Sequence, residues 1–415
     1  MPTRPILLLA ALAAGCTDAM PPVGPAPDPA TCSQSGAGAY GCDGIELLAL
    51  LSVPALGGGP GAAVNDVWGW TDRETGREYA LVGRTDATVF VDITAPATPR
   101  VVGELPLTDG ARPSSWRDMK VHADHVFVVS DGAGAHGMQV FDLRRLRGEE
   151  GAPVTFGADA LYEGIASAHN LAIDTVAGMA VAVGANGGGE TCGGGLHMVD
   201  ITAPLAPAFA GCFNDPATGW GSGYTHDAQC VTYQGPDTRF TGRRICFGAN
   251  VDVLSIADVT DPANPIALAA AGYPAAGYLH QGWLTDDRRY FFMDDEADEF
   301  RGIGNTRTLV WDVARLDDPI LVKEHSGTTR STDHNLYIRR DRLYQANYTS
   351  GLRVLDISDP RNPVEVGWFD TVPGADGPGF QGAWSVYPFF ESGTLIVTSI
   401  DEGLFILRPE PGSGI

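Results

Sequence analysis

Short stretches in which apolar and polar residues alternate recur along the chain, each followed by a turn rich in proline. Segment 351–367 (GLRVLDISDPRNPVEVG) shows the unit: an alternating run leads into Asp356, and Pro360 and Pro363 follow four and seven residues later. Alternation with a period of two is typical of a half-buried β-strand, and proline interrupts strand pairing. The pattern therefore predicts a strand, a tight turn and a second strand.

The same unit repeats at intervals near fifty residues. The equivalent positions are Asp92, Asp142, Asp200, Asp258, Asp312, Asp356 and, in a last copy without the acid, Arg408. Successive positions are 50, 58, 58, 54, 44 and 52 residues apart. A repeat of this length made of short strands is typical of a propeller blade, so we expect seven blades.

The repeats predict an all-β fold, a seven-bladed β-propeller formed by residues 45–415. The last repeat provides only three strands, whereas residues 45–54 (IELLALLSVP) form a lone strand at the start of this region. We expect this N-terminal strand to complete the last blade, because closure removes the exposed edges of an open array. The 53 glycines and 29 prolines fit many turns between short strands.

The first residues have the pattern of an export signal. Arg4 precedes a short apolar stretch, and the small residues before Cys16 are similar to a bacterial lipobox. This similarity implies that residues 1–15 are a signal peptide and that Cys16 is lipidated. Residues 16–44, rich in proline and glycine, then form a tether. We therefore expect a lipid-anchored protein of the bacterial cell envelope. In Gram-negative lipoproteins an aspartate after the lipidated cysteine usually retains the protein at the inner membrane. Thr17 occupies this position here, so we expect the outer membrane or cell surface.

Six cysteines follow Cys16, and cysteines of an exported protein usually form disulfides. Cys32 and Cys42 are close in sequence, and the other four cysteines lie around two expected hairpins. These positions suggest three local pairs, Cys32 with Cys42, Cys192 with Cys212, and Cys230 with Cys246. A metal site is the alternative, but the chain has no Cys-x-x-Cys pair.

The formal net charge of −24, with two lysines in the whole chain, predicts an acidic surface. Such a surface repels phosphate backbones, so we expect no nucleic-acid partner. The expected partners are a membrane, reached through the lipid only, and a protein or small-molecule ligand.

Polar pairs begin six of the seven expected innermost strands, which line the channel of a propeller. Four of these strands place histidine at the same position: His169, His226, His280 and His334. Neutral imidazoles bind Cu, Zn, Fe or Ni, so one hypothesis is a transition-metal site at the axis. The other channel candidates for ligand binding are Asp66, Arg117, Asp118, Asn170, Asp227, Gln281 and Asn335. The alternative is a structural role, in which these groups hydrogen-bond one another.

An acidic run follows the expected second strand of the fifth blade: Asp294, Asp295 and Glu296, then Asp298 and Glu299. Its carboxylates would add ligands to a metal or bind Ca²⁺. Taken alone, the run is more typical of a solvated loop. The other five histidines do not share the repeated position and are expected to be structural or surface residues.

The chain lacks the common catalytic motifs, among them Gly-x-Ser-x-Gly and His-Glu-x-x-His. This absence favours a surface binding or interaction module over an enzyme. The alternative function is a metal-dependent oxidoreductase or hydrolase whose centre is the four channel histidines, an idea that rests on analogy with other propellers.

Several long phrases resemble the choice-of-anchor B family, and the VDI(T/S)-x-P-x-x-P units resemble its LVIVD-type repeats. Examples are WRDMKVHADHVFVVSD, GYTHDAQCVTYQGPDT and HQGWLTDDRRYFFMDDE, and the resemblance extends from Ile45 to Leu407. It implies a bacterial surface propeller that is attached, in this chain, by an N-terminal lipid. It implies no particular substrate. The departures from its repeat pattern are Arg408 and the degenerate copy at Asp142.

Overall fold

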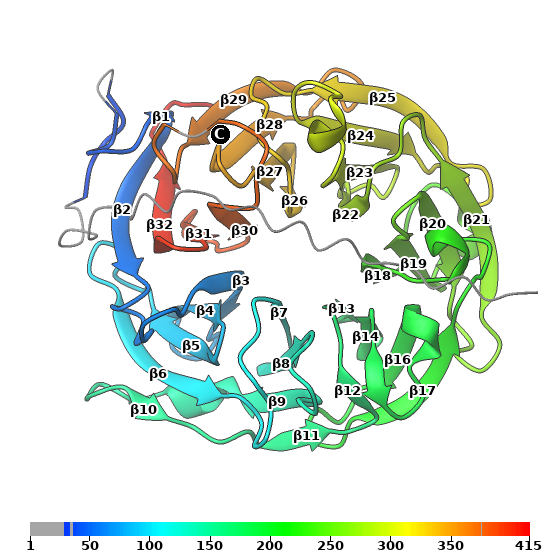
Figure 1. Cartoon of the computed structure of the whole chain (residues 1–415), viewed down its shortest axis with the longest axis horizontal. Coiled ribbons are helices and arrows are strands. Elements are labelled where there is room, and N and C mark those ends of the chain that lie inside the picture. The colour runs from blue at the N-terminus through cyan, green and yellow to red at the C-terminus, as the bar shows by residue number, and fades with distance from the viewer. Residues whose placement is uncertain (1–28, 34–35, 375) are drawn as a thin grey trace, which may run out of the picture.

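The structure, a computed structural model, describes residues 29–33, 36–374 and 376–415. These residues form a ring of seven blades around a central axis (Figure 1). The predicted all-β, seven-bladed fold is thus confirmed. Within the described ranges, no helix is long and apolar enough to cross a membrane. The predicted signal peptide, Cys16 and the tether up to residue 28 lie outside them.

Each blade is an antiparallel sheet whose first strand lies nearest the axis. The innermost strands are β3 (Val64–Thr71), β7 (Arg117–His122), β13 (Asn170–Asp174), β18 (Asp227–Thr232), β22 (Leu279–Leu284), β26 (Leu336–Arg339) and β30 (Ala383–Tyr387). The second strands are β4 (Glu78–Arg84), β8 (His125–Ser130), β14 (Met179–Val183), β19 (Arg244–Ala249), β23 (Tyr290–Asp295), β27 (Arg342–Ala346) and β31 (Leu395–Ser399).

The outer half of each blade contains the repeated unit. The third strands are β5 (Ala87–Asp92), β9 (Met138–Asp142), β16 (Leu196–Asp200), β20 (Val253–Asp258), β24 (Arg307–Asp312), β28 (Leu352–Asp356) and β32 (Gly403–Pro409). The outermost strands are β6 (Arg100–Pro106), β11 (Ala160–Tyr162), β17 (Ala208–Phe213), β21 (Ile266–Gly272), β25 (Ile320–Ser326), β29 (Val364–Phe369) and β2 (Ile45–Ser52).

The remaining elements are short. They are β1 (Cys42–Asp43), β10 (Val154–Thr155), β12 (Ile165–Ser167), β15 (Asn186–Gly188) and the 3₁₀ turns η1 (Leu143–Leu146), η2 (Cys192–Gly194), η3 (Gly219–Gly221), η4 (Thr238–Phe240) and η5 (Glu299–Arg301).

The repeated aspartate ends the third strand of its blade and forms the turn that follows. In all six copies its Oδ1 accepts a hydrogen bond from the backbone N–H two residues later, at 2.8 to 3.0 Å. Aspartate is suited to this position because its short side chain can close a turn on its own backbone. The predicted strand, turn and strand are therefore present, and the aspartate has a structural reason to recur.

The N-terminal strand closes the ring, as predicted. Strand β2 pairs antiparallel with β32, from Ile45 opposite Pro409 to Ser52 opposite Gly403. In Figure 1 the blue strand lies beside the red one at this junction. The described part of the predicted tether also lies on the ring, because β1 pairs with β29 and Ala30 forms a bridge with Leu47.

The core consists of seven apolar clusters, each made by residues of two neighbouring blades. One of them joins Leu404 and Ile406 of the seventh blade to Val82 and Val89 of the first. The chain ends are thus joined by packing as well as by strand pairing.

All three predicted disulfides are present: Cys32–Cys42, Cys192–Cys212 and Cys230–Cys246. The last pair lies directly opposite across β18 and β19. Disulfides are consistent with export, although they do not by themselves assign a compartment.

Candidate functional site

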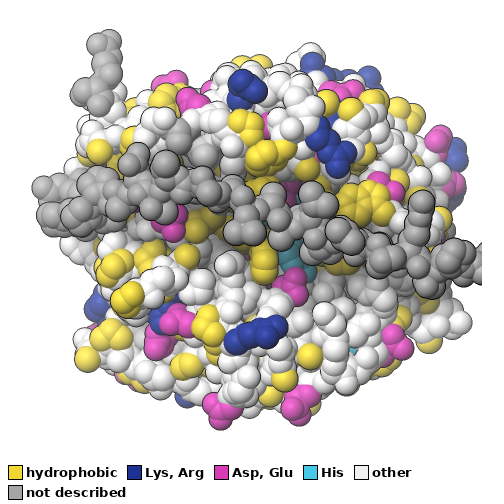
Figure 2. Space-filling view, in the orientation of Figure 1, with side chains coloured by type: hydrophobic (Ala, Val, Ile, Leu, Met, Phe, Trp, Pro, Cys, Tyr) yellow, Lys and Arg dark blue, Asp and Glu magenta, His cyan; other side chains and the backbone are white. Residues whose placement is uncertain are grey.

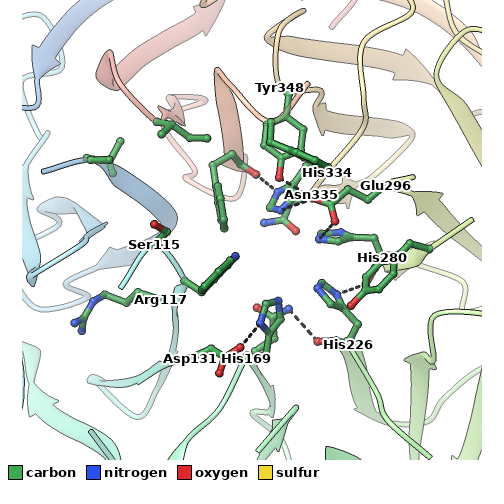
Figure 3. Close-up of a pocket in the computed structure, with 18 of the residues that line it drawn as sticks. Ser115, Arg117, Asp131, His169, His226, His280, Glu296, His334, Asn335 and Tyr348 are labelled. Carbon is green, nitrogen blue, oxygen red and sulfur yellow. Dashed lines mark hydrogen bonds and ion pairs between the residues drawn. The ribbon is translucent and has the colours of Figure 1, made fainter. Parts of the chain in front are cut away.

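A pocket with a volume of about 590 Å³ lies at the propeller axis (Figure 3). Its wall is built from residues at the start of the innermost strands and from residues that follow the second strands. Figure 2 shows histidine, coloured cyan, near the centre of this face. The blade repeat explains the convergence, because equivalent positions of a closed ring meet at its axis.

The four predicted channel histidines all line this pocket. Their rings lie side by side in an arc, with centroids 4.3 Å apart from His169 to His226, 4.2 Å from His226 to His280 and 4.3 Å from His280 to His334 (Figure 3). The sequence prediction that these side chains come together is therefore matched by the geometry. They form a curved row across four adjacent blades rather than a shell around one point.

Hydrogen bonds fix how these rings are turned. Nδ1 of His226 lies 2.9 Å from the backbone oxygen of His280, and Nδ1 of His334 lies 2.6 Å from that of Trp384. A carbonyl oxygen only accepts, so each Nδ1 carries the proton. In a neutral ring Nε2 is then an acceptor with a free lone pair. His169 follows the same orientation, with Nδ1 2.9 Å from Asp131 Oδ2.

The environment keeps the inner rings of the arc neutral. Burial, followed by the neighbouring imidazole of His169, lowers the pKa of His226 well below its ordinary value. Burial and His226 do the same to the pKa of His280. Burial lowers the pKa of His334 to about 3. The pocket thus presents neutral imidazoles, each available as a hydrogen-bond acceptor or a metal ligand.

Glu296 lies between the last two rings of the arc. Its Oε2 is 3.9 Å from Nε2 of His280, and its Oε1 is 3.8 Å from Nε2 of His334. Tyr348 donates a hydrogen bond of 2.7 Å to Oε1. Burial raises the pKa of Glu296 to about 7, although the bond from Tyr348 opposes that shift.

The interpretation of the acidic run as a solvated loop is wrong. Asp294, Asp295, Asp298 and Glu299 are all buried, with exposures of 1%, 0%, 0% and 2%. Asp295 accepts hydrogen bonds from Tyr273 and three backbone N–H groups and so has a structural role. Its neighbour Asp294 accepts from the N–H of Gln281. Four of the five acidic residues are thus buried, two of them within strand β23, which their charge alone does not indicate.

Three further predicted residues line the pocket: Asn170, Asn335 and Arg117. Asn170 donates to the backbone oxygen of His226 at 3.0 Å and so ties two blades together. The guanidinium of Arg117 points away from the axis (Figure 3), with Nη1 3.3 Å from Nε2 of the buried His136.

The other channel candidates, Asp66, Asp118, Asp227 and Gln281, do not line this pocket. Asp118 accepts from the N–H of Leu171 on the next blade, and Gln281 accepts from that of Leu336. These side chains therefore join neighbouring innermost strands.

Lys120 provides the positive charge of this second layer. Its Nζ lies 2.5 Å from Asp118 Oδ1 and 3.4 Å from Asp66 Oδ2, above the ring of Trp68. Burial opposes the charge, but the two carboxylates raise the pKa of Lys120 well above its ordinary value. Burial, and then Asp118, raise the pKa of Asp227 to about 7. Lys120 is thus the counter-charge of Asp118 and Asp66 in the channel.

The aromatic side chains of the pocket were not among the residues predicted from the sequence. Tyr224 and Tyr278 line it, and each stands two residues before a channel histidine. This repeated Tyr-x-His pattern was a usable signal. Asp131 and Glu296 share another position, directly after the second strand of their blades.

Exposed aromatic residues surround the pocket. Trp116 and Phe380 line it, with exposures of 48% and 55%. Phe300, 52% exposed, packs against Phe380 with ring centroids 5.0 Å apart. Trp220, 64% exposed, packs edge-on against Tyr278. Exposed aromatic groups around a polar pocket are a common feature of binding sites.

Comparisons with known proteins support the repeat and the fold. Residues 341–371, which include Asp356, match the LVIVD repeat. This chain is therefore a propeller that contains an LVIVD repeat. The match spans one repeat and confirms that part of the predicted resemblance, while the choice-of-anchor B family remains a prediction. No curated protein matched the chain.

Among solved structures, the β-propeller domain of Cps50 (Swd1) from Myceliophteria thermophila is similar, with 12% sequence identity and a TM-score of 0.51 over 80% of this chain and 94% of that one. A protein from Lactobacillus plantarum shares 12% identity, with a TM-score of 0.48 over 81% of this chain and 88% of its own. At such low identity the first of these likenesses shows the propeller fold alone.

Proposed function

We propose that the protein is a lipid-anchored, extracytoplasmic binding module whose ligand site is the axial histidine pocket. The observation that carries the proposal is the combination of neutral imidazole acceptors inside the pocket with exposed aromatic rings around it. The pocket volume of about 590 Å³ lies within the usual range for small-molecule sites. A β-propeller is consistent with such a role, since it offers a rigid scaffold on which loops and strand ends carry the site.

The chemistry of the pocket selects the ligand class. Nε2 of His169 and of His226 are acceptors, so they require a ligand that donates hydrogen bonds. The flat faces of Trp116 and Phe380 require apolar surface on the same molecule. A saccharide combines hydroxyl donors with apolar C–H faces. We therefore propose a neutral, polyhydroxylated ligand of the size of a mono- or disaccharide.

Export and anchoring belong to the same proposal. Three disulfides support an oxidising compartment, and the lipobox-like segment before Cys16 supports attachment by a lipid. A site at the axis would then face solvent outside the cytoplasm, where free saccharides and polysaccharide chains are available to it.

The test uses the full chain purified in detergent and a panel of mono- and disaccharides as probes. Binding is followed by tryptophan fluorescence, since Trp116 and Trp384 line the pocket, and by calorimetry. We expect Trp116→Ala to weaken the affinity about tenfold or more, the usual effect of removing an aromatic anchor. Phe209→Ala is the matched control, because Phe209 is 49% exposed but lies on the outermost strand β17.

Two outcomes would overturn the proposal. If no saccharide of the panel changes the fluorescence or the heat signal, the proposed ligand class is wrong. If a saccharide binds equally well to the wild-type chain and to Trp116→Ala, the ligand site lies elsewhere.

A further inference from the structure

Side chains that could hold a metal ion gather at one wall of the pocket. Among the described residues, two groups of three or more histidine, cysteine or acidic side chains have donor atoms within 4.8 Å of one another. One group contains Cys192 and Cys212, whose sulfurs form a disulfide and are not thiolates. The other group is His280, Glu296 and His334, at the end of the histidine arc.

The distances of the second group are close to those of a coordination site. Nε2 of His280 and of His334 lie 3.9 and 3.8 Å from the carboxylate oxygens of Glu296. Ligands about 2.0–2.2 Å from a tetrahedral ion lie about 3.4 Å apart. A contraction of roughly half an ångström would therefore bring each histidine to ligand spacing from Glu296. The donor atoms of all three residues already lie within 4.8 Å of one another. Side-chain rotation of Glu296, which reaches the pocket from the loop after β23, can supply it.

The supporting contacts also have the pattern of a metal site. Ligating histidines usually donate their other ring N–H to a carbonyl or a carboxylate, which fixes the ring. His334 donates from Nδ1 to the backbone oxygen of Trp384, and Nδ1 of His280 faces Asp294 Oδ1 at 3.5 Å. Asp294 is 1% exposed, and its Oδ2 has no hydrogen-bond partner. The carboxylate of Glu296 is held by Tyr348.

We propose that His280, His334 and Glu296 bind one divalent transition-metal ion at the wall of the axial pocket, with at least one coordination position open to the pocket. Two imidazoles and one carboxylate form the ligand set of many Zn²⁺ sites, and the same set holds non-haem Fe²⁺. His226 lies next to His280 and faces the open side, so it would contact a molecule bound there. The row of histidines thus has two parts, a metal-binding end and a ligand-binding end.

This site goes beyond the saccharide proposal and does not depend on it. An ion held by two neutral imidazoles and one carboxylate carries a net positive charge, and the buried Asp294 next to His280 would offset it. The arrangement explains why a second carboxylate, with one oxygen that has no hydrogen-bond partner, is buried behind the ring of His280.

The test is metal binding by the full chain, purified in detergent without a His tag, stripped with chelator and then titrated with Zn²⁺ or Co²⁺. We expect one equivalent of Zn²⁺ by elemental analysis, a higher melting temperature, and visible absorption from bound Co²⁺ in a low-symmetry site. Glu296→Gln keeps an oxygen for Tyr348 but lacks the charge, and should weaken binding by at least tenfold. Tyr348→Phe removes only the supporting bond and should weaken it by about tenfold.

His169→Ala is the matched control, because this ring lies at the far end of the arc and should leave metal binding unchanged. Circular dichroism establishes that each variant is folded. The proposal is overturned if the stripped chain takes up no Zn²⁺ or Co²⁺. It is also overturned if folded Glu296→Gln and His334→Gln variants bind the ion as tightly as the wild-type chain. Loss of saccharide binding in Trp116→Ala with full metal uptake would separate this site from the proposed function.

Discussion

Nδ1 of His226 lies 2.9 Å from the backbone oxygen of His280, one blade further around the ring. This contact links the innermost strands of the fourth and fifth blades and points the opposite nitrogen, Nε2, into the pocket. The backbone oxygen of His280 thus determines that His226 presents an unprotonated Nε2 to a ligand. A side chain in this arrangement is held both by its own strand and by its neighbour, which favours a preformed site.

This geometry predicts a single tautomer for two rings of the arc. At neutral pH His226 and His334 should be neutral, protonated on Nδ1 and unprotonated on Nε2, because their Nδ1 atoms face carbonyl oxygens and burial lowers their pKa. Long-range ¹H–¹⁵N NMR of the metal-free chain, with labelled histidine, measures this directly. Imidazolium signals, or rings protonated on Nε2, would contradict the account of the pocket.

The buried His136 predicts an acid-sensitive fold. Burial, and then the guanidinium of Arg117, lower the pKa of His136 to about 4, whereas an unfolded histidine titrates near 6.5. The unfolded chain therefore binds this proton first, so His136 alone lowers the stability by about 3 kcal/mol as the pH drops from about 6.5 to 4. The free energy of unfolding, measured with denaturant at several pH values in this range, should fall less steeply with decreasing pH for His136→Gln than for the wild-type chain. An unchanged decline in that variant would assign the acid sensitivity to other groups.

The turn aspartates should contribute different amounts to the free energy of unfolding, according to their partners. Asp258 caps its turn at Thr260 N and also pairs with Arg243. Asp200 caps its turn at Thr202 N and forms no ion pair with any arginine of the described residues. Asp200→Ala should cost about 1 kcal/mol and Asp258→Ala about 2–3 kcal/mol, since bonds to charged groups are stronger. The free energy of unfolding in urea gives both values. Equal losses would show that the ion pair contributes nothing.

The anchor prediction concerns residues outside the described structure. Cys16→Ala should abolish labelling by a radioactive fatty acid. On detergent phase separation the variant should stay in the aqueous phase, because we expect attachment to the membrane through the lipid only. The wild-type chain should be labelled and should partition into detergent. A Cys16→Ala variant that still partitions with detergent would mean that another segment attaches the protein.

The seven-bladed ring and the convergence of the four channel histidines could be predicted from the sequence, because both follow from one repeat. Once Asp92, Asp200 and Asp356 were aligned, the start of each innermost strand was fixed, and His169, His226, His280 and His334 fell at equivalent positions. Two of the three disulfides followed from the same hairpins, and Cys32–Cys42 followed from the short separation of its cysteines. These features depend on local pattern and on the symmetry of the closed ring.

Residues brought in by irregular loops were harder to predict. Glu296 belongs to a run whose charge suggested solvent, whereas its side chain lines the pocket and is only 18% exposed. Trp116 and Phe380 reach the pocket from segments outside the repeated unit. Asp66 and Asp118 occupy the repeated position, yet Lys120 and neighbouring backbone groups satisfy them. The repeat places a side chain at the axis, whereas its partners decide whether it is available for binding.

The most direct test of the central claim is a ligand titration observed at the histidine rings. The chain has nine histidines, and selective ¹³C labelling gives each ring its own NMR signal. The account predicts that a binding saccharide shifts the signals of His169, His226, His280 and His334 and leaves those of His122 and His325 in place. Saccharide binding that leaves the four pocket signals unmoved would contradict it.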